Sequence, residues 1–203
     1  MSREQNYKNK KGKFIQDFNK DSITFSLIII FITLILYLIS IENYLLFHSL
    51  AESFSIIISC AIFMVIWNSR RYIDNNFFII IGIALLFVSF LDLIHTFSYK
   101  GINIIPGHNT NLPTQLWIAS RFVESITYLA APFFIGKKIR TSIILYIYVF
   151  ITAFFLMSIF YWRIFPQCFI EGYGLTPFKK ISEYIISLIL VAAMYFLYSK
   201  KDS

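Results

Sequence analysis

The sequence has few charged residues, and this scarcity decides its broad class. Asp, Glu, Lys and Arg make up 14% of the 203 residues, whereas a soluble domain carries about 25%. Hydrophobic residues make up 58%, and the mean hydropathy is +0.68. Helices satisfy their backbone hydrogen bonds internally when they lie in lipid. The composition therefore predicts an all-α fold, a polytopic bundle of transmembrane helices.

Common catalytic motifs and paired cysteines are also lacking. The sequence has no P-loop, no GxSxG and no HExxH, so it does not carry the signatures of nucleotide hydrolysis, serine hydrolysis or zinc proteolysis. We expect that the chain is not an enzyme. Of its two cysteines, Cys60 falls inside an apolar run and Cys168 in a loop expected on the opposite side. This separation predicts no disulfide between them.

What the sequence does have is apolar runs long enough to cross a bilayer. A basic cytoplasmic tail is expected over residues 1–22 and a membrane-embedded domain over 23–203. Pro113 suits the first turn of a helix, and Pro132 is expected to kink the inner end of the same span. The six predicted spans cover about 23–41, 44–67, 77–99, 113–136, 142–161 and 182–198.

The net charge of +7 could indicate a nucleic-acid partner, but the positions of the cations favour a membrane topology signal. Thirteen of the 18 Lys and Arg residues lie in the N-terminal tail, the second and fourth loops and the C-terminus, against four on the other side. Cations accumulate on the cytoplasmic side. Both termini are therefore predicted to be cytoplasmic, the partner to be the lipid bilayer, and no nucleic acid is expected.

Three of the predicted spans carry ionisable or polar stripes. Spacings of three, four and seven residues place side chains on one helix face, and the predicted orientation puts all three stripes at similar depth in the outer half of the bilayer. Charged groups inside a membrane are costly unless they pair, which predicts that the stripes face one another. The candidate ligand-binding residues are His48 and Glu52, Asp92 and His95, and Trp117, Arg121 and Glu124.

Arg121 provides the sharpest geometric expectation. Its guanidinium stays protonated and offers five donors. A bidentate contact across the helix interface satisfies more of these donors than a neighbour on the same helix. The sequence therefore predicts a carboxylate contact with Asp92 or Glu52, and a His95 side chain that points into the same cavity. Polar clusters also hold membrane helices together without binding a ligand, which is the simpler reading.

Two other interpretations use the same residues. A metal or haem site would take His48 and His95 as ligands, with Glu52 and Asp92 as further metal candidates. Neither the His48/Glu52 pair nor the Asp92/His95 pair has a standard zinc spacing. An intramembrane enzyme or transporter would use Asp92 and His95 as a proton relay, but the sequence has no internal repeat to support transport.

Four segments resemble a known family. They are LFHSLAE (46–52), WNSRRYIDNN (67–76), LDLIHTFSYKG (91–101) and NLPTQLWIASRFVES (111–125). Together they are similar to the membrane-associated sensor domain of the third described type, and the likeness spans the chain after the N-terminal tail. The polar positions characteristic of that family fall on the seven candidate residues named above.

The resemblance implies a bacterial inner-membrane, multi-pass sensory module of about eight helices. Such modules precede PAS, histidine kinase or diguanylate cyclase domains, which implies two-component or cyclic-di-GMP signalling, a small-molecule or ion signal and a cytoplasmic kinase or cyclase partner. A second copy, in a homodimer, is a further candidate partner. This sequence has six expected spans and no output domain. We therefore expect a shortened sensor, or a subunit that signals through a partner.

Overall fold

The computed structural model describes residues 3–73, 75–102, 104–105, 109–137 and 139–199. These residues form six α-helices and a two-stranded antiparallel sheet, and the chain divides into two units, Met1–His48 and Ser49–Ser203. Five of the helices are long and apolar enough to cross a membrane. The predicted class, a polytopic transmembrane helix bundle, is confirmed.

The first unit consists of α1 (Arg3–Glu42) and the start of α2 (Tyr44–Ser69). The part of α1 that is long and apolar enough to span a membrane is Ser22–Glu42. The helix continues back to Arg3 through the basic segment. Asn43 separates α1 from α2, and its side-chain oxygen accepts a hydrogen bond from the Leu46 N–H at 3.0 Å. Asparagine suits this role because its side chain satisfies an unpaired N–H of the first turn.

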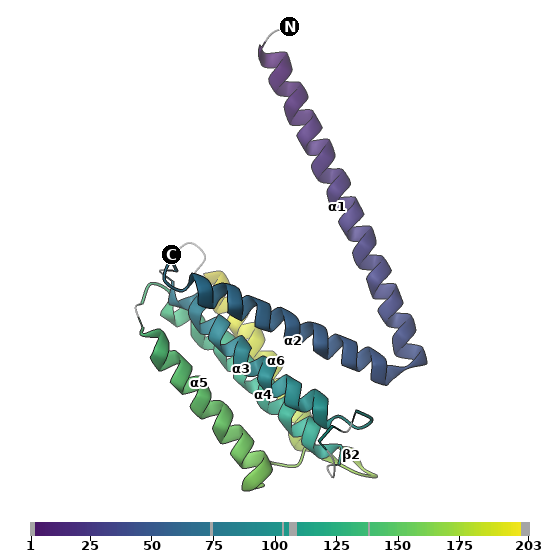
Figure 1. The fold of residues 1–203 in the computed structure, drawn as a ribbon, viewed down its shortest axis with the longest axis vertical. Coiled ribbons are helices and arrows are strands. Elements are labelled where there is room, and N and C mark those ends of the chain that lie inside the picture. The colour runs from purple at the N-terminus through teal and green to yellow at the C-terminus, as the bar shows by residue number, and fades with distance from the viewer. Residues whose placement is uncertain (1–2, 74, 103, 106–108, 138, 200–203) are drawn as a thin grey trace. The chain divides into compact units, whose positions relative to one another are not determined.

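The second unit is built around α4 (Asn111–Ala130), which packs against both α3 (Asn76–Ser98) and α6 (Pro177–Ser199) (Figure 1). Helix α5 (Thr141–Leu156) packs on α3 and ends in a short π-helix, η2 (Met157–Tyr161). The main apolar core lies among α3, α4 and α5. A 3₁₀ turn, η1 (Ala131–Phe134), follows α4 and contains Pro132, where the sequence predicts a kink.

The remainder of α2 approaches α3 closely. A Cβ atom added to Gly82 would lie 2.8 Å from Cγ2 of Ile66 and 2.9 Å from its Cβ. Real Cβ atoms do not come this close to a branched side chain, so the absence of a side chain at Gly82 allows the two helices to meet. This is one point at which α2, the helix that carries Glu52, meets α3, the helix that carries Asp92 and His95.

Two boundaries differ from the predicted spans. Helix α6 begins at Pro177 and not at 182. The Thr176 hydroxyl accepts a hydrogen bond from the Lys179 N–H at 3.3 Å, and a threonine cap followed by proline is a standard helix start. Helix α4 begins at Asn111, two residues before the predicted Pro113. It falls outside the five membrane-competent helices because it carries more polar residues than they do.

The segment between η2 and α6 is ordered against the start of α4. It holds the hairpin of β1 (Phe169–Ile170) and β2 (Gly174–Leu175). The side-chain oxygen of Asn111 accepts hydrogen bonds from the backbone N–H groups of Cys168 and Phe169, at 2.7 and 2.9 Å. The sequence predicts a surface loop here. The structure adds that α4 holds this loop through side-chain contacts.

Candidate functional site

Helix α3 places two ionisable side chains on its buried face. Asp92 is 2% exposed and His95 is 4% exposed. They are three residues apart, so one face of the helix carries both. The same face packs against α4, which makes α4 the source of their partners.

Arg121 of α4 joins the two helices by ion pairs. Its Nη2 donates to Oδ2 of Asp92, and its Nη1 donates to Oε2 of Glu124 at 2.5 Å. The predicted inter-helix carboxylate contact is therefore present, with Asp92 as the partner, but the expectation of a bidentate contact is wrong, because only Nη2 reaches Asp92. The i, i+3 neighbour Glu124 takes a second donor. Ser120 accepts a further hydrogen bond from Nη2 at 3.3 Å.

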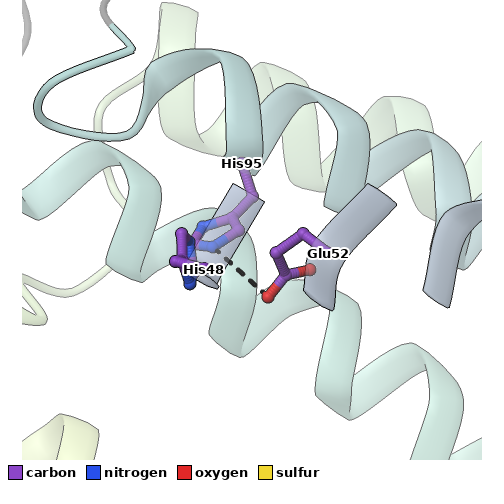
Figure 2. Close-up of side chains that lie close together, drawn as sticks. All are labelled: His48, Glu52 and His95. Carbon is purple, nitrogen blue, oxygen red and sulfur yellow. Dashed lines mark ion pairs between the residues drawn. The ribbon is translucent and has the colours of Figure 1, made fainter. Parts of the chain in front are cut away.

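His95 is held between two elements of the same unit. Its Nδ1 donates to the backbone carbonyl of Pro113, 2.7 Å away. Its Nε2 lies 4.0 Å from Oε1 of Glu52, and Figure 2 shows these two side chains facing each other across α3 and α2. Because a carbonyl can only accept, the Nδ1 carries a proton, and this hydrogen bond sets the orientation of Nε2.

Glu52 connects the two groups of contacts. It lies within electrostatic range of both Asp92 and Arg121, while its own carboxylate faces His95. Glu52, Asp92, His95, Arg121 and Glu124 thus form one set of ionisable side chains, which we call the charge cluster. It draws on α2, α3 and α4, the three elements that the sequence analysis identified.

Two of the seven candidate residues, Trp117 and His48, are not part of the charge cluster. The ring of Trp117 lies under the Lys179 ammonium of α6, with Nζ 5.3 Å from the ring centroid, and packs beside Ile118 and Ile186. Its role as a ligand-binding residue stays a prediction. His48 is the last residue of the first unit, and its role as a ligand also stays a prediction.

Three further contributors to the charge cluster are not among the residues predicted from the sequence. The Tyr128 hydroxyl donates to Oε1 of Glu124 at 3.2 Å, and it follows Glu124 by four residues, so extending the α4 stripe by one turn would have found it. The Ser120 hydroxyl donates to the Val88 carbonyl at 3.4 Å. The third is the carbonyl of Pro113, and no property of its side chain signals that role.

The charge cluster is unbalanced in charge and in hydrogen bonds. Its three carboxylates face one arginine, which leaves two negative charges in excess, or one if His95 is protonated. Among the residues that the structure describes, the buried atoms Oδ1 of Asp92 and Nε of Arg121 have no hydrogen-bond partner. A buried polar atom without a partner costs about 1–3 kcal/mol. The cluster therefore contains one acceptor and one donor that no described group satisfies.

Comparison with known proteins identifies the family. No curated protein and no solved structure matches the chain. The family model MASE3, described as a membrane-associated sensor domain, matches residues 39–203. The match covers α2 to α6 and all the residues of the charge cluster. The protein is thus a multi-pass membrane protein that belongs to the MASE3 family of membrane-associated sensor domains.

Proposed function

We propose that this chain is the sensory input module of a bacterial inner-membrane signalling system, and that the charge cluster is its detector. The signal would be a small ligand or an ion that reaches the cluster from the outer half of the bundle. In this proposal Arg121 orients an anionic or carbonyl group, and Asp92, Glu52 and Glu124 accept hydrogen bonds or hold a cation. A cytoplasmic kinase or cyclase would read the result.

The observation that carries the proposal is the pair of unpartnered buried atoms, Oδ1 of Asp92 and Nε of Arg121. A cluster that served only to hold helices together would gain stability by satisfying both atoms. A group with one donor and one acceptor can bind both at once. The excess of negative charge favours a ligand that brings a cation or a proton.

Signalling requires that the ligand bind one arrangement of the helices more tightly than another. The Arg121–Asp92 ion pair joins α4 to α3, and the Glu52–His95 pair joins α2 to α3. A ligand that competes for either pair therefore changes the packing of α3 against a neighbour. An output domain attached to the bundle would read this change.

The proposal is tested by fusing the chain in frame to a diguanylate cyclase or histidine kinase reporter and screening stimuli. We expect Arg121→Gln and Asp92→Asn to abolish the response while the protein still reaches the membrane. Glu183→Gln, which breaks the Lys179–Glu183 pair on α6, is the control and should respond normally. If both cluster variants respond like the unmodified chain, the charge cluster is not the detector.

A metal site is the second candidate, and one observation favours it. His95 donates its Nδ1 proton to a backbone carbonyl and directs Nε2 toward the Glu52 carboxylate, which is how proteins orient a histidine ligand. His48, four residues before Glu52 in the sequence, is the other histidine that the sequence predicts as a ligand. A bound metal ion would supply a positive charge. Haem is the alternative to a single metal ion at this site.

Elemental analysis and an absorption spectrum of the purified protein separate these forms. A stoichiometric metal that is lost in His95→Ala supports a metal site, and a Soret band supports haem. Protein expressed with ample iron and zinc that shows neither would exclude this candidate.

A further inference from the structure

A polar cavity lies at the end of the second unit where α4 begins, separate from the charge cluster. Its volume is about 570 Å³, within the range of small-molecule sites. One wall is apolar and is formed by Leu112, Ile159, Phe160 and Phe165. The polar wall is formed by Asn109, Asn111, Gln115, Arg163 and Gln167.

The internal hydrogen bonds of this end of the unit leave donors on the two asparagines. The side-chain oxygen of Asn109 accepts from the Asn111 N–H at 3.2 Å. The side-chain oxygen of Asn111 accepts from Cys168 and Phe169. Both amide oxygens thus already accept hydrogen bonds, and the NH₂ groups are the donors that these side chains can offer to a ligand.

Gln115 has the opposite arrangement. Its Nε2 donates to the carbonyls of Phe165 and Pro166, at 3.0 Å each. This leaves its Oε1 as an acceptor for a ligand. Gln115 is 8% exposed, so its side chain is fixed by the packing around it.

Arg163 supplies the charge. Among the described residues it is the only ionisable one that lines the cavity, and it has no ion pair with a carboxylate there. Its backbone has φ of 52°, a left-handed conformation that is unusual for a residue with a side chain. The next two N–H groups, of Ile164 and Phe165, bond back to the Ser158 carbonyl. This tight return of the chain at the end of η2 places Arg163 at the cavity.

We propose that this cavity binds a small organic carboxylate that also carries a hydrogen-bond donor and an apolar group. Arg163 and the asparagine NH₂ groups bind the carboxylate, Gln115 accepts from the donor, and the apolar wall takes the rest of the molecule. An α-amino acid with an apolar side chain has this chemistry. The site does not depend on the charge cluster, although both contact α4, about 9 Å apart along the helix between Gln115 and Arg121.

Three matched probes test the proposal on the full chain purified into lipid nanodiscs. Phenylalanine carries all three features, 3-phenylpropionate lacks the ammonium donor, and 2-phenylethylamine lacks the carboxylate. Titration calorimetry should show saturable binding of phenylalanine, weaker binding of 3-phenylpropionate and no binding of 2-phenylethylamine. Binding of the amine as tight as that of phenylalanine overturns the proposal. So does the absence of saturable binding by all three up to about 10 mM.

Variants of Arg163 make the assignment specific. Arg163→Asn removes the charge and keeps a residue that tolerates a left-handed backbone, so the fold is preserved. It should weaken phenylalanine binding by about tenfold or more, since charge-assisted hydrogen bonds are the strong ones. Arg163→Lys should retain most of the affinity. Lys100→Asn removes an exposed cation that does not line the cavity and should change nothing. Equal affinity in Arg163→Asn and the unmodified chain would place the binding elsewhere.

Discussion

The Nδ1 of His95 donates to the carbonyl oxygen of Pro113, 2.7 Å away, and so joins the end of α3 to the first turn of α4. Asparagine can imitate an Nδ1 donor, whereas the longer glutamine imitates Nε2. We expect His95→Asn to be more stable than His95→Gln by about 1 kcal/mol, the contribution of one hydrogen bond. Thermal unfolding in detergent measures the difference. Equal stability of the two variants would show that the Pro113 contact contributes nothing.

The Arg121–Asp92 pair is expected to couple more strongly than an ion pair at the edge of the unit. A double-mutant cycle with Asp92→Asn and Arg121→Gln should give a coupling free energy of about 1–2 kcal/mol, in the upper range for membrane helices. The Lys179–Glu183 pair on α6 is the matched control, and an i, i+4 pair of this kind contributes about 0.3–0.5 kcal/mol. Coupling energies in the reverse order would contradict the view that Arg121 holds α4 to α3.

Gly82 is expected to tolerate no side chain. Gly82→Ala places a Cβ 2.8 Å from Cγ2 of Ile66, and overpacking of this kind destabilises by about 1–3 kcal/mol. Ile66→Ala removes two of the three atoms that the new Cβ meets. The double variant should therefore be less destabilised than the sum of the two single variants, as measured by unfolding. Simple additivity would indicate that α2 moves aside at no cost.

The Cys168 thiol is expected to be unreactive in the folded protein. It is fully buried, and burial raises its pKa from the ordinary 9.0 to about 12, although the nearby Lys179 ammonium lowers it. The thiolate is the reactive form, so alkylation of Cys168 in a Cys60→Ser background should be slow at pH 8 and faster as the pH rises. Denatured protein is the control, and labelling within minutes at pH 8 without denaturant would contradict the burial.

The same pKa shift predicts how stability changes with pH. The folded state holds the thiol proton more tightly than the unfolded state does, so this contribution is complete below about pH 9 and is lost between about 9 and 12. Cys168→Ala should show a smaller loss of stability across this interval, measured by unfolding at several pH values. An identical loss in both proteins would show that Cys168 does not titrate in this way.

The sequence predicted the parts of the molecule that follow from the cost of charge in lipid. Arg121 cannot lose its proton, so a carboxylate partner was required, and helical spacing made Asp92 a candidate. The contacts of Asn111 and Gln115 with the loop after η2 were not predictable, because an amide can bond to any nearby backbone group and the loop position depends on the whole bundle. The contact of Trp117 with Lys179 was missed because helical spacing alone groups Trp117 with Arg121.

The start of α6 was predictable in principle. Thr176 followed by Pro177 is a capping signal. Hydropathy alone indicates a later start, because Lys179 and Lys180 lower the hydropathy of the first turn. Hydropathy is also a poor guide to α4. This helix is too polar to count among the membrane-competent helices, yet it packs against both α3 and α6.

The polar character of α4 has a consequence for how the chain is made. A helix that carries Arg121 and Glu124 enters lipid unfavourably by itself, since each charge adds about 2.5–3.5 kcal/mol to the insertion free energy. Asp92 of α3 pairs with Arg121, and α6, which also packs against α4, leaves the ribosome more than forty residues after α4. We therefore expect the insertion machinery to hold α4 beside α3 until α6 is synthesised. Helix α4, the fourth to be translated, would then be the last to be released into the lipid.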